Sequence, residues 1–224
     1  MFSARFCRNY SAVFGLLLLI CVGLMAASAS VLFPEDPWDM VSTPFLWPGQ
    51  DHNFLLGSDI MGRDLAAGLF HGSRVSLLVG FSATLAAVLI GTTIGAIAGY
   101  YGGLADSIAM AITELFQTIP QFIFAIVVVA ILSPTVTTVT FALGIVSWPS
   151  IARLVRAEFM TLRERDFVAA SVSIGMSSFR IITTQILPNA LGPIIVTGSL
   201  MVATAILTEA GLAFLGLGDP NVMS

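Results

Sequence analysis

The stretch that decides the fold runs from Leu115 to Ala152 and reads LFQTIPQFIFAIVVVAILSPTVTTVTFALGIVSWPSIA, 38 residues without one Asp, Glu, Lys or Arg. A membrane-spanning helix needs about 20 mostly apolar residues, and this stretch would measure about 57 Å as a single helix. Ser133-Pro134 lies near its middle, and the residue before a proline is disfavoured in helical conformation. The stretch therefore predicts two membrane helices joined by a tight turn, at about 118–132 and 135–150.

Three other runs without charged residues each predict one more membrane helix. They cover residues 9–34, 75–105 and 181–208, and we expect their helices at about 12–32, 76–99 and 190–209. The predicted fold class is therefore an all-α integral membrane protein with about five transmembrane helices. Its expected parts are an N-terminal transmembrane helix in 1–33, an outer segment in 34–75 and a helical core in 76–224.

The composition excludes several classes of protein. The chain is 57% hydrophobic and 10% charged, with a mean hydropathy of +0.96, whereas soluble domains are about 45–50% apolar and about 25% charged. All nine basic residues are arginine and the net charge is −4, so we expect no basic patch for nucleic acid. A chain without lysine cannot form a P-loop, so a P-loop nucleotide-binding protein is excluded.

Catalytic and metal-binding residues are not expected in this chain. His52 and His71 are its only histidines, and neither has a cysteine or a second histidine at metal-ligand spacing. Cys7 and Cys21 are interpreted as unpaired thiols rather than as a disulfide framework. The sequence contains no recognisable constellation of acid, base and nucleophile, so an intramembrane enzyme is disfavoured.

The N-terminal run allows two interpretations. Arg5 and Arg8 precede an apolar stretch that ends in Ala27-Ser28-Ala29, a pattern that is also typical of a cleaved secretory signal peptide. We favour an uncleaved helix, because the apolar run continues to Phe33. The positive-inside rule then places the N-terminus in the cytoplasm, since seven of the nine arginines fall on that side. In this orientation Ser133-Pro134 lies outside, and 100–117 and 151–188 lie inside.

The second predicted span carries a small residue at every fourth position, which places these residues on one helix face. They are Ala83, Ala87, Gly91, Gly95 and Gly99. Small faces allow helix backbones to approach closely in lipid. We therefore interpret the stripe as a helix-packing surface, and a pore-lining role is the alternative.

Polar residues inside the spans are few. Thr113, Gln117 and Gln121 flank Pro120, and we interpret them as inter-helix hydrogen-bonding residues rather than as the lining of a polar path. Glu209 lies at the expected outer end of the last span and is interpreted as an interfacial or helix-packing residue. Because no ionisable residue lies near the middle of a span, a proton-coupled transporter built on this chain alone is disfavoured.

The segment from Glu158 to Pro188 is the densest polar stretch, within a cytoplasmic loop predicted at about 153–188. Residues 156–170 favour a helix, Gly175 is a typical helix end, and Ser177 or Ser178 can cap a second short helix that ends before Pro188. An apolar stripe runs through the segment and consists of Phe159, Leu162, Val168 and Ile174. The pattern fits docking into a partner's groove and resting on lipid headgroups equally well.

This segment resembles the EAA loop of ABC importer permeases, whose pattern is Glu-Ala-Ala, three residues, Gly, and later Ile-x-Leu-Pro. Ala169-Ala170-Ser171 stand where Glu-Ala-Ala belongs, Gly175 is the glycine, and Leu187-Pro188 close the pattern. The resemblance implies that the segment docks an ATPase subunit. The usual glutamate is replaced by Ala169, so either Glu164 and Asp166 carry the acidic contact or the partner interface is specialised.

Other segments resemble, in order, the dipeptide, oligopeptide and nickel permease group of ABC importers. They are 57–64, 72–77, 99–106, 148–167 and 208–218. The long outer segment with Pro34-Glu35-Asp36-Pro37 resembles the C-type subunit of the permease pair. The resemblance implies the type I importer permease fold. That family usually has six transmembrane helices, so this chain is expected to be a fragment or a truncated form.

The resemblance also implies partners. A homologous B-type permease shares the translocation path, ATPase subunits hold ATP and Mg, and a periplasmic or lipid-anchored binding protein delivers the substrate. The implied location is the bacterial cytoplasmic (inner) membrane, with no cofactor on this chain itself. Di- and oligopeptides are the first expected substrates. A nickel or glutathione importer of the same architecture, and a truncated membrane subunit without transport, remain alternatives.

Overall fold

The computed structural model describes residues 8–220 and 222, and Arg5, Cys7 and Ser224 lie outside this range. Within the described range the chain is helical, and its extended pairing is an isolated antiparallel bridge between Ser58 and Asp64. Four helices are long and apolar enough to cross a membrane, and a bent pair of shorter helices is a fifth candidate. The predicted all-α membrane fold with about five spans is therefore confirmed.

Two compact units make up the chain, with boundaries after Leu78 and after Gly218. The first unit begins with helix α2 (Tyr10–Leu32), where Asn9 Oδ1 accepts the Ala12 N–H at 3.3 Å. This is the bond of an N-cap residue. α2 runs unbroken through Ala27-Ser28-Ala29, the alternative cleavage site, and Cys21 on it is an exposed free thiol.

The segment that follows α2, which is predicted to lie outside, has little regular structure but is held together by hydrogen bonds. The buried Ser58 hydroxyl donates to the Thr43 carbonyl at 2.6 Å and accepts the Leu46 N–H at 3.0 Å. His71 Nε2 lies 2.9 Å from the Phe33 carbonyl oxygen. The histidine thus joins the C-terminal end of α2 to the next helix.

Helix α3 (Leu65–Tyr101) has 37 residues, which corrects the predicted span of 76–99. Asp64 Oδ1 accepts the Ala66 N–H at 2.8 Å, so this residue caps the helix start. The predicted start at residue 76 was based only on the length of the apolar run. The helix in fact begins earlier, because the less apolar residues 65–75 form its first turns after the Asp64 cap. The predicted outer segment 34–75 therefore ends in helix.

The helix predicted at 118–132 is present as α5 (Gln121–Leu132), and an additional helix, α4 (Gly103–Gln117), precedes it. They are bent by 78° relative to each other across a break of three residues. α5 has 12 residues, about 18 Å of helix, which is too short to cross a bilayer alone. The helix is thus placed as predicted but is not a complete span by itself: Pro120 favours a helix start, and the candidate span is divided between the two helices on either side of it.

Helix α6 (Val136–Arg163) begins where predicted, with Thr135 Oγ1 accepting the Thr138 N–H at 3.1 Å. It does not end at residue 150 as predicted but continues through the buried Pro149 to Arg163. The span and the first part of the expected cytoplasmic loop are thus one continuous helix.

The last part of the chain is helical with short interruptions. Its elements are α7 (Asp166–Ser173), α8 (Ser178–Ile181), the π-helical turn η1 (Ile182–Ile186), α9 (Leu187–Leu212) and the π-helical turn η2 (Ala213–Leu217). α8 ends at Ile181, before Pro188 as predicted, but the chain stays helical beyond it, because η1 joins α8 to α9. A π turn widens the helix locally and gives the proline ring room in the first turn of α9.

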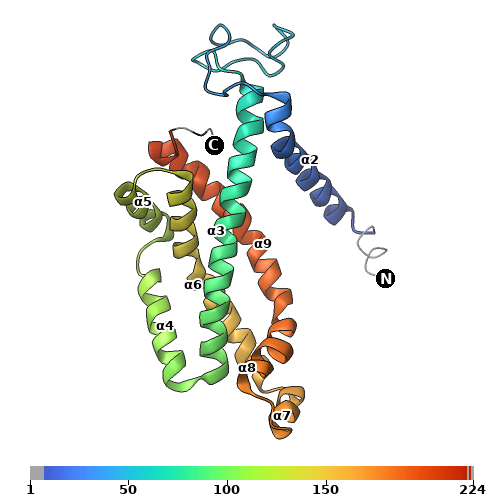
Figure 1. Cartoon of the computed structure of the whole chain (residues 1–224), viewed down its shortest axis with the longest axis vertical. Helices are drawn as coiled ribbons and strands as arrows, with labels where there is room; N and C mark the ends of the chain where they lie inside the picture. The colour runs from blue at the N-terminus through green and yellow to red at the C-terminus, as the bar shows by residue number, and fades with distance from the viewer. Residues whose placement is uncertain (1–7, 221, 223–224) are drawn as a thin grey trace. The chain divides into compact units, whose positions relative to one another are not determined.

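In the second unit α6 lies along α9, and α3 lies along α6 (Figure 1). The small-residue stripe of α3 faces α6 and consists of Ala83, Ala87, Gly91, Gly95 and Gly99. A Cβ atom added at Gly95 would lie 2.5 Å from the Ala152 carbonyl oxygen and 2.8 Å from the Val155 Cβ. The backbones therefore approach as closely as only small residues permit.

Candidate functional site

The predicted docking segment begins with an unpredicted break. α6 ends at Arg163, and Arg165 is extended before α7 starts at Asp166. The carboxylate of Asp166 lies in the first turn of α7, where the helix dipole favours negative charge. The helix predicted from Arg156 to Ala170 is thus two helices. The sequence concealed the break because neither Glu164 nor Arg165 is a helix breaker.

Gly175 ends α7 in a Schellman motif. Its φ is +79°, a left-handed conformation that glycine adopts without steric cost. The Gly175 N–H donates to the Val172 carbonyl at 2.9 Å and the Met176 N–H to the Ser171 carbonyl at 3.1 Å. These two bonds define the motif. Ser177 stands at the start of α8, although its side chain makes no capping hydrogen bond.

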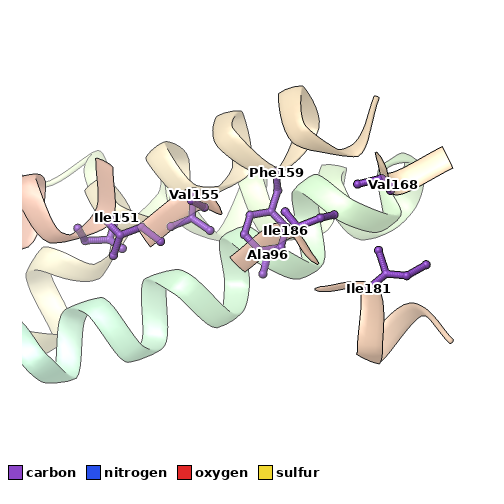
Figure 2. Close-up of a cluster of buried hydrophobic side chains, with 9 residues drawn as sticks. Ala96, Ile151, Val155, Phe159, Val168, Ile181 and Ile186 are labelled. Atoms are coloured by element: carbon purple, nitrogen blue, oxygen red, sulfur yellow. The ribbon is translucent and has the colours of Figure 1, made fainter. Parts of the chain in front are cut away.

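The inward face of the segment is anchored in a buried apolar cluster. Figure 2 shows Val168 of α7, Ile181 of α8 and Ile186 of η1 in one cluster with Val155 and Phe159 of α6. Each of the five side chains is at most 2% exposed. Because closely packed interiors transmit strain, this cluster connects α7 and α8 mechanically to α6.

The outward face presents apolar side chains that the described residues leave uncovered. Val172, Ile174 and Phe179 are 57%, 78% and 76% exposed. The predicted apolar stripe is therefore divided. Its members Phe159 and Val168 are buried, whereas Ile174 is exposed.

The residues of the predicted loop pattern take different positions on this segment. Glu164, Asp166, Ala169, Ala170, Gly175 and Pro188 are exposed, Leu187 is half-buried and Ser171 is buried. The Ser171 hydroxyl donates to the Phe167 carbonyl at 2.8 Å, so it is occupied within its own helix. The exposed residues can contact a partner. Ser171 and Leu187 instead face the interior of the chain, where Leu187 packs against the buried apolar cluster.

An open pocket of about 420 Å³ lies between α7 and the end of α3. Its lining comprises Tyr100, Tyr101, Arg163, Val168, Ala169, Val172 and Ser178. The Tyr100 and Tyr101 rings meet edge to face with centroids 5.1 Å apart. The exposed alanine of the loop pattern, Ala169, is thus on the rim of a hollow that can accept a partner's side chain.

A second polar arrangement beside this segment escaped the sequence analysis. Arg156 of α6 forms a two-pronged ion pair with Asp106 of α4, with Nη2 and Oδ2 2.6 Å apart. Arg163 Nη1 donates to the Tyr100 carbonyl at 2.8 Å. The ion-paired residues are 50 positions apart, so no local pattern links them. The sequence does contain one signal: Arg156 and Arg163 are seven residues apart, and this spacing places both on one face of a helix.

Two of the polar side chains that flank Pro120 have hydrogen-bond partners, one in a neighbouring helix and one in its own helix, whereas the buried Thr84 and Thr92 hydroxyls of α3 have none among the described residues. Gln121 Nε2 of α5 donates to Ser147 Oγ of α6 at 2.7 Å, and the buried Thr113 hydroxyl donates to the Ala109 carbonyl at 2.7 Å. Glu209 is buried in α9, 4% exposed. Across the part of the chain that the structure describes, no three His, Cys, Asp or Glu side chains are grouped to hold a metal ion.

The fold defines a class of protein. It is similar to a solved structure of the MetNI methionine ABC transporter in inward-facing conformations, with a TM-score of 0.58 and 21% sequence identity. The similarity covers 69% of this chain and 77% of that chain. The chain therefore has the type I fold of an ABC importer permease and is a multi-pass membrane protein.

The chain belongs to the family of binding-protein-dependent transport system inner membrane components, whose family model matches residues 91–223. Residues 1–53 match the N-terminal TM domain of oligopeptide transport permease C. The dipeptide transport system permease protein DppC of Haemophilus influenzae is 38% identical over 218 residues, 95% of this chain and 74% of that protein. The oligopeptide transport system permease protein OppC of Bacillus subtilis is 36% identical over 220 residues, 96% and 70% of the two chains. The chain is thus a DppC/OppC-like permease.

Proposed function

We propose that this chain is the C-type permease subunit of an ATP-driven importer of di- and oligopeptides in the bacterial cytoplasmic membrane, with its N-terminus in the cytoplasm. It forms the translocation path together with a homologous B-type permease, and a periplasmic or lipid-anchored binding protein supplies the peptide. ATP and Mg are held by partner ATPase subunits. The names of the relatives support the peptide substrate, and the absence of lysine, hence of a P-loop, supports an external ATPase.

The observation that carries this proposal is the outward apolar face of α7 and α8 on a rigid support. Exposed apolar side chains that are held in place are typical of protein interaction sites. Here Ile174 and Phe179 are exposed on either side of the Schellman turn, while Val168 and Ile181 fix the turn to the core. A partner bound to this face therefore contacts α7 and α8, which are packed against α6.

Coupling then follows from the packing. When the ATPase subunits close or open, they displace α7 and α8, and the buried cluster passes this displacement to α6 and α9. The spans change between two packings as rigid bodies, since packed interfaces switch between discrete states rather than deform continuously. No residue of this chain makes or breaks a covalent bond.

The test replaces Gly175. In Gly175→Arg, a long charged side chain is added in a left-handed conformation that costs a residue with a Cβ about 1–2 kcal/mol. In Gly175→Asn, the control, the side chain is short and tolerates that conformation. We expect Gly175→Arg to insert into the membrane but to lose at least ten-fold of its peptide-stimulated ATP hydrolysis and transport, and Gly175→Asn to keep most of both.

The measurement uses the tagged chain captured with its partners from its native host and reconstituted in proteoliposomes. Full peptide-stimulated hydrolysis by the Gly175→Arg complex would contradict the docking assignment. Stimulation of the wild-type complex by glutathione or Ni²⁺ but not by dipeptides would replace the proposed substrate. Capture of the wild-type chain without any ATPase subunit would overturn the transport function.

A further inference from the structure

The corner between α3 and α4 is a rigid turn that two glycines permit. Gly102 has φ +66° and ψ −159°, and Gly103 has φ +53°. The first of these conformations is essentially restricted to glycine. α3 therefore ends at Tyr101 and α4 starts at Gly103 with no flexible loop between them.

Two arginines of α6 hold this corner on either side of the turn. Arg163 donates to the carbonyl of Tyr100 at 2.8 Å, and its Nη1 would lie 3.5 Å from a Cβ atom added at Gly102. Arg156 holds Asp106 in the first turn of α4 through both carboxylate oxygens. Each contact also matches a helix dipole, with a cation at the end of α3 and an anion at the start of α4.

The two arginines lie in the part of α6 that leads directly to the docking segment. Arg163 is the last residue of α6, and Arg156 lies two turns before it on the same face. The two-pronged contact between Arg156 and Asp106 fixes orientation as well as distance, because two N–H groups meet two carboxylate oxygens in one plane. α4 therefore cannot slide along α6 without breaking the ion pair.

A third contact holds the other arm of the bent span. Gln121, the first residue of α5, donates to Ser147 of α6 at 2.7 Å. The break between α4 and α5, where the axes differ by 78°, thus lies between two points that are both attached to α6. Broken helices at membrane depth are tolerated where they are packed in protein or line a cavity.

We propose that Arg156, Asp106 and Arg163 form a clamp by which α6 carries the movement of the docking segment to the bent span α4–α5. Arg156 and Asp106 are positioning residues in this scheme, and neither touches the transported molecule. This inference rests on the proposed function, since it assumes that an ATPase drives the docking segment. Breaking the ion pair leaves ATPase docking and hydrolysis in place and uncouples them from transport.

The test measures dipeptide transported per ATP hydrolysed in proteoliposomes that hold the whole complex, with radiolabelled dialanine as the probe. Asp106→Asn and Arg156→Gln are each expected to lower this ratio at least five-fold while the ATPase subunits stay bound. The exchanged pair, Asp106→Arg with Arg156→Asp, is expected to recover at least half of the wild-type ratio. Arg153→Gln is the control, because Arg153 is an exposed arginine one turn earlier on the same helix.

The outcomes separate the clamp from the proposed function. If both single variants keep the wild-type ratio, or if the exchanged pair assembles but stays uncoupled, the clamp is wrong although the transporter assignment stands. If the single variants fail to assemble, the exchanged pair alone decides between these results. A wild-type complex that binds no ATPase subunit would instead overturn the proposed function itself. A drop in the ratio with Arg153→Gln equal to that of Arg156→Gln would also overturn the clamp.

Discussion

Gly95 and Gly192 are both helical glycines within candidate spans, yet their surroundings differ. A Cβ atom at Gly95 would meet the Ala152 carbonyl oxygen at 2.5 Å, whereas one at Gly192 would meet no atom within 4 Å. We expect Gly95→Ala to destabilise the folded chain by about 1–3 kcal/mol through overpacking. Gly192→Ala is expected to be neutral or stabilising by up to about 1 kcal/mol, because alanine is the better helix former.

Thermal unfolding of the purified chain in detergent, followed by size-exclusion chromatography after heating, measures this difference. A lower midpoint is expected for Gly95→Ala alone. Equal midpoints for the two variants would mean that α3 and α6 do not approach as closely as the structure describes.

For single residues, the sequence predicts a structural role where that role depends on residue type or on spacing along the chain. The four-residue spacing of Gly91, Gly95 and Gly99 indicates a packing face from the sequence alone, and Gly175 marks a helix end by its residue type. The pair of Arg156 and Asp106 could not be predicted in this way. The two residues meet only because α4 and α6 pack side by side, and that packing depends on the whole core.

Among the elements, α7 and α8 contain a matched pair of isoleucines. Ile181 is 1% exposed in the core cluster, and Ile174 is 78% exposed at the end of α7. We expect Ile181→Ala to cost about 2–5 kcal/mol, as other large-to-small core changes do, and to accelerate amide hydrogen exchange across residues 166–181. Ile174→Ala is expected to leave exchange unchanged and to weaken ATPase binding about ten-fold, as loss of an interface anchor does.

Hydrogen-exchange mass spectrometry and a binding titration of the detergent-solubilised complex read out the two effects. If Ile174→Ala accelerated exchange as strongly as Ile181→Ala, the outward face would be part of the core rather than a docking surface.

The element boundaries show where sequence reasoning stops. The start of α6 was predicted from Ser133-Pro134, because a proline acts on its immediate neighbours. The break at Glu164-Arg165 and the π turn before Pro188 have no such signal, since they result from tertiary packing. Pro120 was present in the sequence, but its role as a boundary within one span became clear only from the lengths of α4 and α5.

For the whole molecule, the bent pair α4–α5 decides the topology. If it crosses the membrane as one span, Ser133 lies outside and Ser173 in the docking segment lies inside. If the pair enters and leaves the membrane on the same side, Ser133 lies inside and Ser173 lies outside. We expect Ser133→Cys, in a chain with Cys7 and Cys21 replaced by serine, to react with a membrane-impermeant maleimide added to intact spheroplasts.

Ser173→Cys in the same background is expected to react only after the membrane is permeabilised. Protection of Ser133→Cys from the external reagent, with labelling after permeabilisation, would show that the pair is re-entrant and that the five-span topology is wrong.

The central claim is that the outward face of α7 and α8 contacts an ATPase subunit, and site-specific photo-crosslinking tests it most directly. p-Benzoylphenylalanine is introduced in place of Ile174 in cells that express the complete transporter, and in place of Leu207 of α9, which is 73% exposed, as the control. After irradiation and capture of the tagged chain, mass spectrometry identifies the partner. We predict an adduct with the ATPase subunit from position 174 and none from position 207. An adduct with lipid only, or no ATPase adduct, from position 174 would contradict it.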